Sequence, residues 1–160
     1  MNDAHWHLLL NHLPIIFPVI GLLIMFGGFI FKSEIVKRTS YAIFILVAIL
    51  TVPVFATGEG AEETVENLKG IDEKFIKIHE EVAETFAFLS YILGAISLIG
   101  FWANFKKKSF SNIISSLTII FSLVVLYFAK HAGTTGGEIR HTEIRNNGSY
   151  SVASEKQDED

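Results

Sequence analysis

The sequence predicts an all-α protein, an integral membrane four-helix bundle of up-down topology with both termini on the outer, periplasmic side. Half of its 160 residues are apolar, only 19% are charged and the mean hydropathy is +0.41. Soluble domains carry about a quarter charged residues. The apolar residues are gathered in four stretches without Asp, Glu, Lys or Arg, at 13–31, 39–58, 85–105 and 109–129. This pattern excludes a soluble enzyme, a disordered chain and a nucleic-acid-binding protein.

Each of the four stretches is long enough to cross a lipid bilayer as a helix. At about 1.5 Å per residue, a stretch of this length spans roughly 30 Å, the thickness of the hydrocarbon core. Only helices and closed barrels satisfy their backbone hydrogen bonds in lipid, so we expect helices. The connections within the first pair and within the second pair are short, which makes the helices of each pair antiparallel neighbours.

The charges between these stretches predict their orientation. The connections 32–38 and 106–108 carry +2 and +3, whereas the N-terminal residues, the acidic loop 59–84 and the segment from Lys130 onward carry −1, −6 and −2. Short Lys- and Arg-rich loops stay in the cytoplasm. No basic residue precedes Lys32, unlike in a secretory signal peptide, so we expect the first span to be retained. The sequence thus predicts a multi-pass protein of the bacterial inner (plasma) membrane.

One transmembrane domain, residues 1–145, is expected to precede a disordered polar tail, residues 146–160. The first helix is expected to start near Pro14, since a proline there costs no internal hydrogen bond. Apolar residues at helical spacing from Asp72 onward predict that the third helix projects beyond the membrane. Glycines within 133–137 are expected to end the fourth helix.

All six histidines fall on the predicted outer side. Three of them, His12, His79 and His131, lie at the boundaries of three different helices. Neutral imidazole is the commonest protein ligand for transition metals and also binds haem iron. A b-type haem needs one or two axial histidines from different helices and basic partners for its propionates, for which Lys130 and Arg140 are candidates.

Two other interpretations of the histidines remain open. The same three histidines, with Glu80 and Glu84 as further ligands, would suit a Zn, Cu or Fe ion. Interfacial histidines can also lie among lipid headgroups without binding anything, as in a non-catalytic accessory subunit of a larger membrane complex. The chain has no cysteine, no His-Glu-x-x-His motif and no nucleophile elbow, so we expect an electron carrier or accessory subunit rather than an enzyme.

Two short motifs resemble a known family. Residues 7–15 (His-Leu-Leu-Leu-Asn-His-Leu-Pro-Ile) resemble the His-Pro-x-x-x-His-Phe-Pro-Ile opening of a family of small four-helix bacterial membrane proteins of unknown function. Residues 136–141 (Gly-Gly-Glu-Ile-Arg-His) resemble that family's closing glycine pair with its following histidine. The family is itself similar to the di-haem cytochrome b group. The resemblance implies site roles for His7, His12 and His141, and it implies haem binding.

The chain departs from the family pattern at Leu8 and Leu13, which stand where the family has proline and phenylalanine, and its last histidine follows the glycine pair sooner. The sequence as a whole predicts a b-type haem protein that transfers electrons near the outer face. Its expected partners are the lipid bilayer and quinone or other respiratory membrane subunits.

Overall fold

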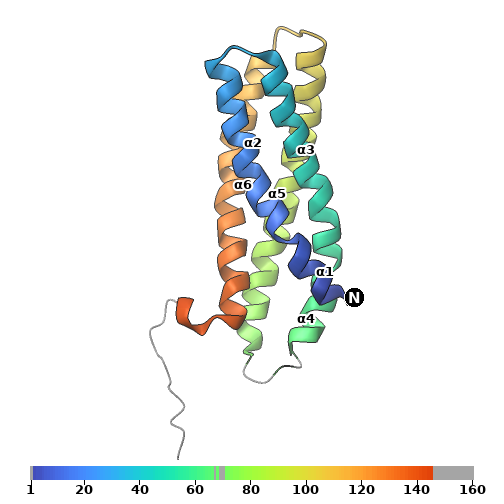
Figure 1. Cartoon of the computed structure of the whole chain (residues 1–160), viewed down its shortest axis with the longest axis vertical. Coiled ribbons are helices and arrows are strands. Elements are labelled where there is room, and N and C mark those ends of the chain that lie inside the picture. The colour runs from blue at the N-terminus through green and yellow to red at the C-terminus, as the bar shows by residue number, and fades with distance from the viewer. Residues whose placement is uncertain (1, 67, 69–70, 146–160) are drawn as a thin grey trace, which may run out of the picture.

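The computed structural model describes residues 2–66, 68 and 71–145, and all regular secondary structure in this part of the chain is helical. The order is α1 (Asp3–Leu10), α2 (His12–Ile30), α3 (Glu34–Ala56), α4 (Gly58–Glu66), α5 (Glu73–Phe105), α6 (Ser111–Arg140) and the 3-10 turn η1 (Thr142–Ile144). Figure 1 shows α2, α3, α5 and α6 running side by side as a bundle, with α1 and α4 near one end. The predicted tail 146–160 lies outside the described residues.

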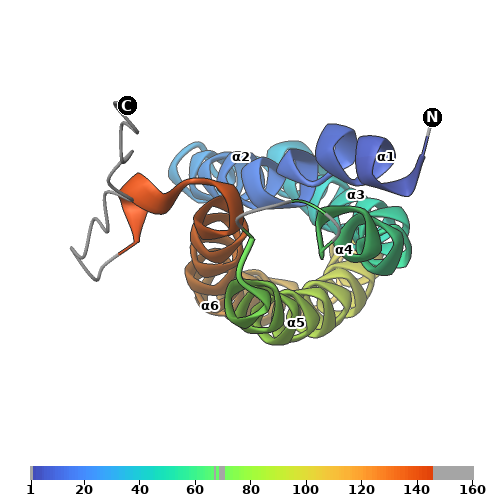
Figure 2. The same ribbon diagram turned by 90° about the horizontal axis from the view of Figure 1, so that it is seen from below.

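Four helical stretches are long and apolar enough to cross a membrane: Asp3–Ile30, Glu34–Glu66, Glu73–Phe105 and Ser111–Arg140. The all-α class and the four membrane-length helices predicted from the sequence are therefore confirmed. Seen along its long axis, the bundle is a ring in which α2 lies beside α3, α3 beside α5, and α5 beside α6 (Figure 2). The helix α2 also contacts α6, which closes the ring.

The two ends of the bundle differ in composition. We call the end with the α2–α3 and α5–α6 turns the lysine end; it holds Lys32, Lys37, Arg38 and Lys106 to Lys108. The opposite end, which we call the histidine end, holds α1, α4, the start of α5 and the end of α6 (Figure 1). All six histidines belong to these elements, to the first turn of α2 or to the residue after α6. The two basic connections therefore lie at one end of the bundle, and the described part of the acidic segment 59–84 lies at the other.

Local sequence signals fix where several helices begin. The side chain of Asn2 accepts a hydrogen bond from the His5 backbone N–H at 3.1 Å and caps α1. Ser33 caps α3 and Asp72 caps α5 in the same way. Such capping side chains satisfy backbone N–H groups that have no partner within the helix. Each of the two turns at the lysine end also contains a residue with left-handed backbone, since Lys32 and Lys107 have φ of 50° and 51°.

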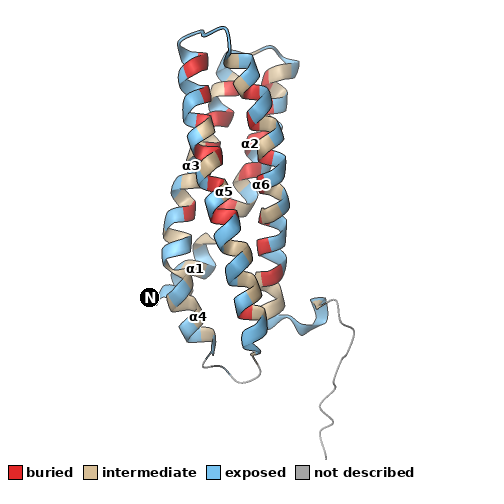
Figure 3. Cartoon of the chain, turned by 180° about the vertical axis from the view of Figure 1, so that it is seen from behind, coloured by how far each residue is buried: buried red, intermediate tan, exposed pale blue. Residues whose placement is uncertain are grey.

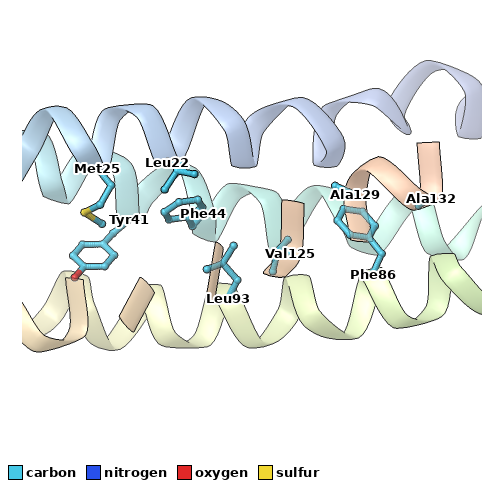
Figure 4. Close-up of a cluster of buried hydrophobic side chains, with 9 residues drawn as sticks. All are labelled: Leu22, Met25, Tyr41, Phe44, Phe86, Leu93, Val125, Ala129 and Ala132. Atoms are coloured by element: carbon cyan, nitrogen blue, oxygen red, sulfur yellow. The ribbon is translucent and has the colours of Figure 1, made fainter. Parts of the chain in front are cut away.

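Small residues let the helices approach one another closely around a buried core (Figures 3 and 4). A Cβ on Gly21 would lie 2.7 Å from the Phe44 ring, and one on Gly94 would lie 2.5 Å from the Ala48 Cβ. Along α5, the small residues Ala87, Ser90 and Gly94 are buried. Close packing of this kind drives association between helices in lipid, where burial of apolar surface provides little driving force.

Several boundaries differ from the sequence prediction. The helix α3 begins at Glu34 rather than at 39, so Lys37 lies inside the bundle instead of in a connection. The acidic segment 59–84 contains most of α4. Its second part agrees with the prediction of helix from Asp72 onward, because α5 begins at Glu73 with Asp72 as its N-cap. The short helix α1 precedes α2, which begins at His12 rather than near Pro14. Hydrogen bonds and packing with neighbouring helices stabilise these extensions, and such contacts are not visible in a hydropathy pattern.

The prediction that glycines at 133–137 end the last helix was wrong. The helix α6 continues through all of them to Arg140. Glycine within a helix costs about 1 kcal/mol relative to alanine. At Gly136 the missing side chain makes room for the ring of His79, whose Cε1 would lie 3.0 Å from an added Cβ. Tertiary packing therefore offsets the weak helix propensity at this position.

Candidate functional site

Two of the six histidines turn toward neighbouring helices at the histidine end. His7 on α1 and His79 on α5 are half-buried, and each makes a side-chain hydrogen bond to another helix. The other four are exposed: His5, His12, His131 and His141. We therefore treat His7 and His79 as the centre of the candidate site.

His7 is held by the end of α3. Its Nδ1 lies 3.0 Å from the backbone carbonyl oxygen of Val54, in the last turn of that helix. Carbonyl oxygens of a last turn lack partners within their own helix, so they accept hydrogen bonds from elsewhere. A carbonyl cannot donate, so Nδ1 carries the proton of this bond. In the neutral ring, Nε2 then has a free lone pair.

His79 is held by α6 in a comparable way. Its Nδ1 lies 3.1 Å from the hydroxyl oxygen of Thr135. That hydroxyl lies 3.1 Å from the His131 carbonyl oxygen and 3.2 Å from the Ala132 carbonyl oxygen, so it donates to the backbone of its own helix. It must then accept from Nδ1 of His79, which again leaves Nε2 with the lone pair in the neutral ring. Gly136, which has no side chain, packs against the same ring.

Each of the two rings is a potential metal ligand. They come from α1 and α5, which are far apart in the chain. Histidines that bind metals commonly donate their second ring N–H to a carbonyl or another acceptor, which fixes the tautomer and the ring orientation. Both His7 and His79 have this arrangement.

The remaining predicted site residues lie elsewhere on the surface. The His131 ring stacks on Tyr127, with ring centroids 6.2 Å apart and an interplanar angle of 14°. His141 pairs with Glu143, with Nδ1 2.8 Å from Oε1. Exposed positions on three helices hold the rest, namely His12, Glu80, Glu84 and Arg140.

No group of three or more His, Asp or Glu side chains is arranged to hold a metal ion in the part of the chain that the structure describes. The predicted set of His12, His79 and His131 with Glu80 and Glu84 is therefore not gathered into one site. Of that set, only His79 turns inward. The other histidine that turns toward a neighbouring helix is His7, which the family resemblance had singled out.

Two features of this site were not predicted from the sequence: the capped helix that carries His7, and the contact of Thr135 with His79. Asn2 and Asp3 stand just before a helical run, which is a helix-start signal, and a helix there gives His7 a fixed direction. Thr135 carries no signal of its own, because a threonine within a glycine-rich segment looks like part of a turn.

No protein-family model matches the chain, and neither a curated protein nor a solved structure matches it. The interpretation of the site rests on its own geometry.

Proposed function

We propose that this chain is a membrane protein that binds a b-type haem through Nε2 of His7 and Nε2 of His79 and transfers electrons near one membrane face. The observation that carries the proposal is the pair of inward-turned imidazoles whose Nδ1 protons are already committed to Val54 and Thr135. Each ring thereby presents the nitrogen that a metal would need.

The number of ligands favours haem over a free metal ion. A protein site for Zn²⁺ or a similar ion takes three or four side-chain ligands, and no such group is present among the described residues. A haem supplies four nitrogen ligands itself and needs only one or two axial histidines. If a haem were bound, the imidazoles of His7 and His79 would hold it, and it would supply one-electron transfer.

Apolar and basic side chains of the kinds that contact a haem also lie near His79 or its partner Thr135 along the chain. Phe86, Ala129 and Ala132 are buried together at one end of the core (Figure 4), and they lie within two turns of His79 or Thr135 along their helices. Lys130 and Arg140 are exposed on the same part of α6. These two basic side chains could pair with propionates at the water boundary.

The charge distribution supports an orientation with the lysine end in the cytoplasm and both termini outside. The lysine end carries +5, whereas the rest of the chain carries −9, and short basic loops remain on the cytoplasmic side. In this orientation the haem lies near the outer face of the inner membrane. Its electron partner would then be quinone or another respiratory subunit reached from that side.

An absorption spectrum of the full chain, purified in detergent after expression with ample haem, tests the proposal. We expect a Soret band and a sharp visible band on reduction, as for six-coordinate haem. His7→Ala and His79→Ala should each remove or shift these bands because each deletes one axial ligand. The matched controls His12→Ala and His131→Ala remove exposed histidines of the same end and should leave the spectrum unchanged.

Other outcomes would favour the alternatives. A colourless protein that contains near-stoichiometric Zn, Cu or Fe would indicate a divalent-metal protein. A colourless, metal-free protein whose assembly tolerates removal of all six histidines would indicate an accessory subunit. Loss of the Soret band in His12→Ala and His131→Ala, but not in His7→Ala, would contradict the pairing proposed here.

A further inference from the structure

A pocket of about 430 Å³ opens at the lysine end, far from the histidines. It is lined by the end of α2, the α2–α3 turn and the first turns of α3 and α6, through Phe29, Lys32, Glu34, Lys37 and Asn112. Two of these five residues are lysines, and one is acidic. The pocket is therefore a basic site at the end of membrane-length helices.

Lys37 is the most unusual of these residues, because its side chain is only 5% exposed. Its Nζ donates hydrogen bonds to Oε1 of Glu34 and Oδ1 of Asn112, both at 2.9 Å. It also lies 4.6 Å from the centroid of the Phe29 ring, a cation–π arrangement. The ammonium group is thus fixed in the wall of the pocket instead of moving freely in water.

Further donors face the same space. Asn112 accepts from Lys37 with Oδ1, which turns its Nδ2 group away from that lysine. Lys32 is exposed and lies in the α2–α3 turn. Glu34 offsets the charge of Lys37, and its second oxygen is occupied by Nδ2 of Asn104. The charge of Lys32 therefore remains for a ligand, and it is positive.

The neighbours of these residues are apolar and exposed. Ile30, Phe31, Ile35 and Ile113 are each more than 60% exposed, and each lies within two residues of a side chain that lines the pocket. A ligand that satisfies both parts of this surface must combine an anionic group with long apolar chains. Basic pockets between membrane helices on the cytoplasmic side bind anionic lipid headgroups in this way.

We propose that this pocket binds the headgroup phosphate of an anionic phospholipid, with the acyl chains lying against the exposed apolar side chains beside it. Lys32 supplies the uncompensated charge, Lys37 orients the amide of Asn112 so that its Nδ2 group can donate, and Phe29 forms the apolar floor. The site is independent of haem binding at the other end of the bundle.

Native mass spectrometry of the full chain in detergent tests this proposal with two probes of identical acyl chains, dioleoyl phosphatidylglycerol and dioleoyl phosphatidylcholine. We expect one phosphatidylglycerol to be retained about fivefold more strongly than phosphatidylcholine. Lys32→Gln should reduce that retention about fivefold, since one lysine near an anionic headgroup contributes about that factor. Lys107→Gln is the matched control, because Lys107 has the same charge, end and left-handed backbone but does not line the pocket.

Two results would overturn the proposal. Equal retention of the two lipids, or equal loss in Lys32→Gln and Lys107→Gln, would mean that binding follows general charge attraction and not this pocket. If millimolar inorganic phosphate raised the melting temperature of the lipid-free protein as much as phosphatidylglycerol does, and only when Lys32 is present, the ligand would be free phosphate and not a lipid. Because Lys32 is exposed, its variant should fold normally, which circular dichroism can verify.

Discussion

The lysine end and the histidine end differ in how their polar side chains are hydrogen-bonded. At the lysine end, side chains join three helices through Lys37 with Asn112, Glu34 with Asn104, and Tyr41 with Ser115. At the histidine end, the imidazoles of His7 and His79 each use one nitrogen for a neighbouring helix. The lysine end satisfies its buried charge with partners from its own chain, whereas the histidine end leaves two Nε2 atoms available to a ligand.

This difference indicates which end is structural and which end is suited to a cofactor. A buried ammonium group that lacked partners would carry a large desolvation penalty, so Lys37 needs its partners for the bundle to be stable. A neutral imidazole tolerates partial burial at much lower cost. We therefore expect mutations at the lysine end to reduce stability, and mutations at the histidine end to change ligand binding with less effect on stability.

The largest effect should come from Lys37→Met, which removes the buried ammonium group but keeps the side-chain length. We expect the variant to be about 3 kcal/mol less stable because both hydrogen bonds and the contact with the Phe29 ring are lost. Thermal unfolding in detergent measures this loss. Lys107→Gln, in the other turn of the same end, is the control and should change stability by less than about 0.5 kcal/mol. Equal effects of the two changes would contradict the structural role of the network.

A somewhat smaller effect should come from Gly100→Ala. The added Cβ would overlap the fully buried Tyr41 ring, which has no space to move away. Overpacking of this kind costs about 2 kcal/mol. Gly27→Ala provides the control, since nothing lies within 4 Å of its Cβ position, and it should be neutral or up to about 1 kcal/mol stabilising. A stabilised Gly100→Ala protein would show that α5 and α3 are less tightly packed there.

At the histidine end, Gly136→Ala should alter the His79 ring more than the overall stability. The new Cβ would lie 3.0 Å from Cε1 and 3.3 Å from Nδ1 of His79, so the ring must shift away from residue 136. We expect a stability change below about 1 kcal/mol, because better helix propensity offsets the crowding. Imidazole ¹⁵N chemical shifts of His79 should change clearly. Gly133→Ala, whose Cβ would meet only Ile15 at 3.6 Å, should leave them as they are.

The smallest effect concerns the exposed pair of His141 and Glu143. The pKa of Glu143 lies below its usual range because its own backbone N–H and the His141 ring hydrogen-bond to the carboxylate. Since the folded-state pKa is the lower one, the pair stabilises the fold above the unfolded pKa, about 4.3, and this contribution is lost as pH falls through the folded pKa.

A carboxyl ¹³C titration should therefore give Glu143 a midpoint below the ordinary value, and His141→Ala should raise that midpoint. Because both side chains are exposed, the melting temperature at neutral pH should not change measurably. An unchanged Glu143 midpoint in His141→Ala would show that the pair does not persist in solution.

The sequence could predict most of the fold because charge and apolarity have strong effects in a membrane. A lysine or glutamate at the centre of the bilayer is costly, so charge-free stretches of membrane length identify the helices. Boundaries were harder, as Lys37 shows. Its charge suggested a loop, but Glu34, Asn112 and Phe29 surround it inside the helical bundle. One of the residues that hydrogen-bond to the Lys37 ammonium group, Asn112, lies 75 positions away in the chain.

The candidate site could be predicted only in part. The sequence places all histidines at one end, but His12, at a helix boundary, is exposed, whereas His7 turns inward. Direction depends on how each helix is rotated about its axis. A soluble helix reveals that rotation through an apolar stripe. The spanning helices here are apolar on all sides, because both the core and the lipid are apolar, so the pattern gives little information on direction.

By itself, the sequence determined an all-helical chain with four membrane-length helices, basic residues at one end and histidines at the other. Those features follow from the order of apolar and charged residues along the chain, because lipid accepts apolar side chains and excludes charged ones. Only the tertiary structure decided that the rings of His7 and His79 hydrogen-bond to neighbouring helices, and that Lys37 is buried. Those features depend on contacts between distant helices, because packing and hydrogen bonding set the rotation of each helix.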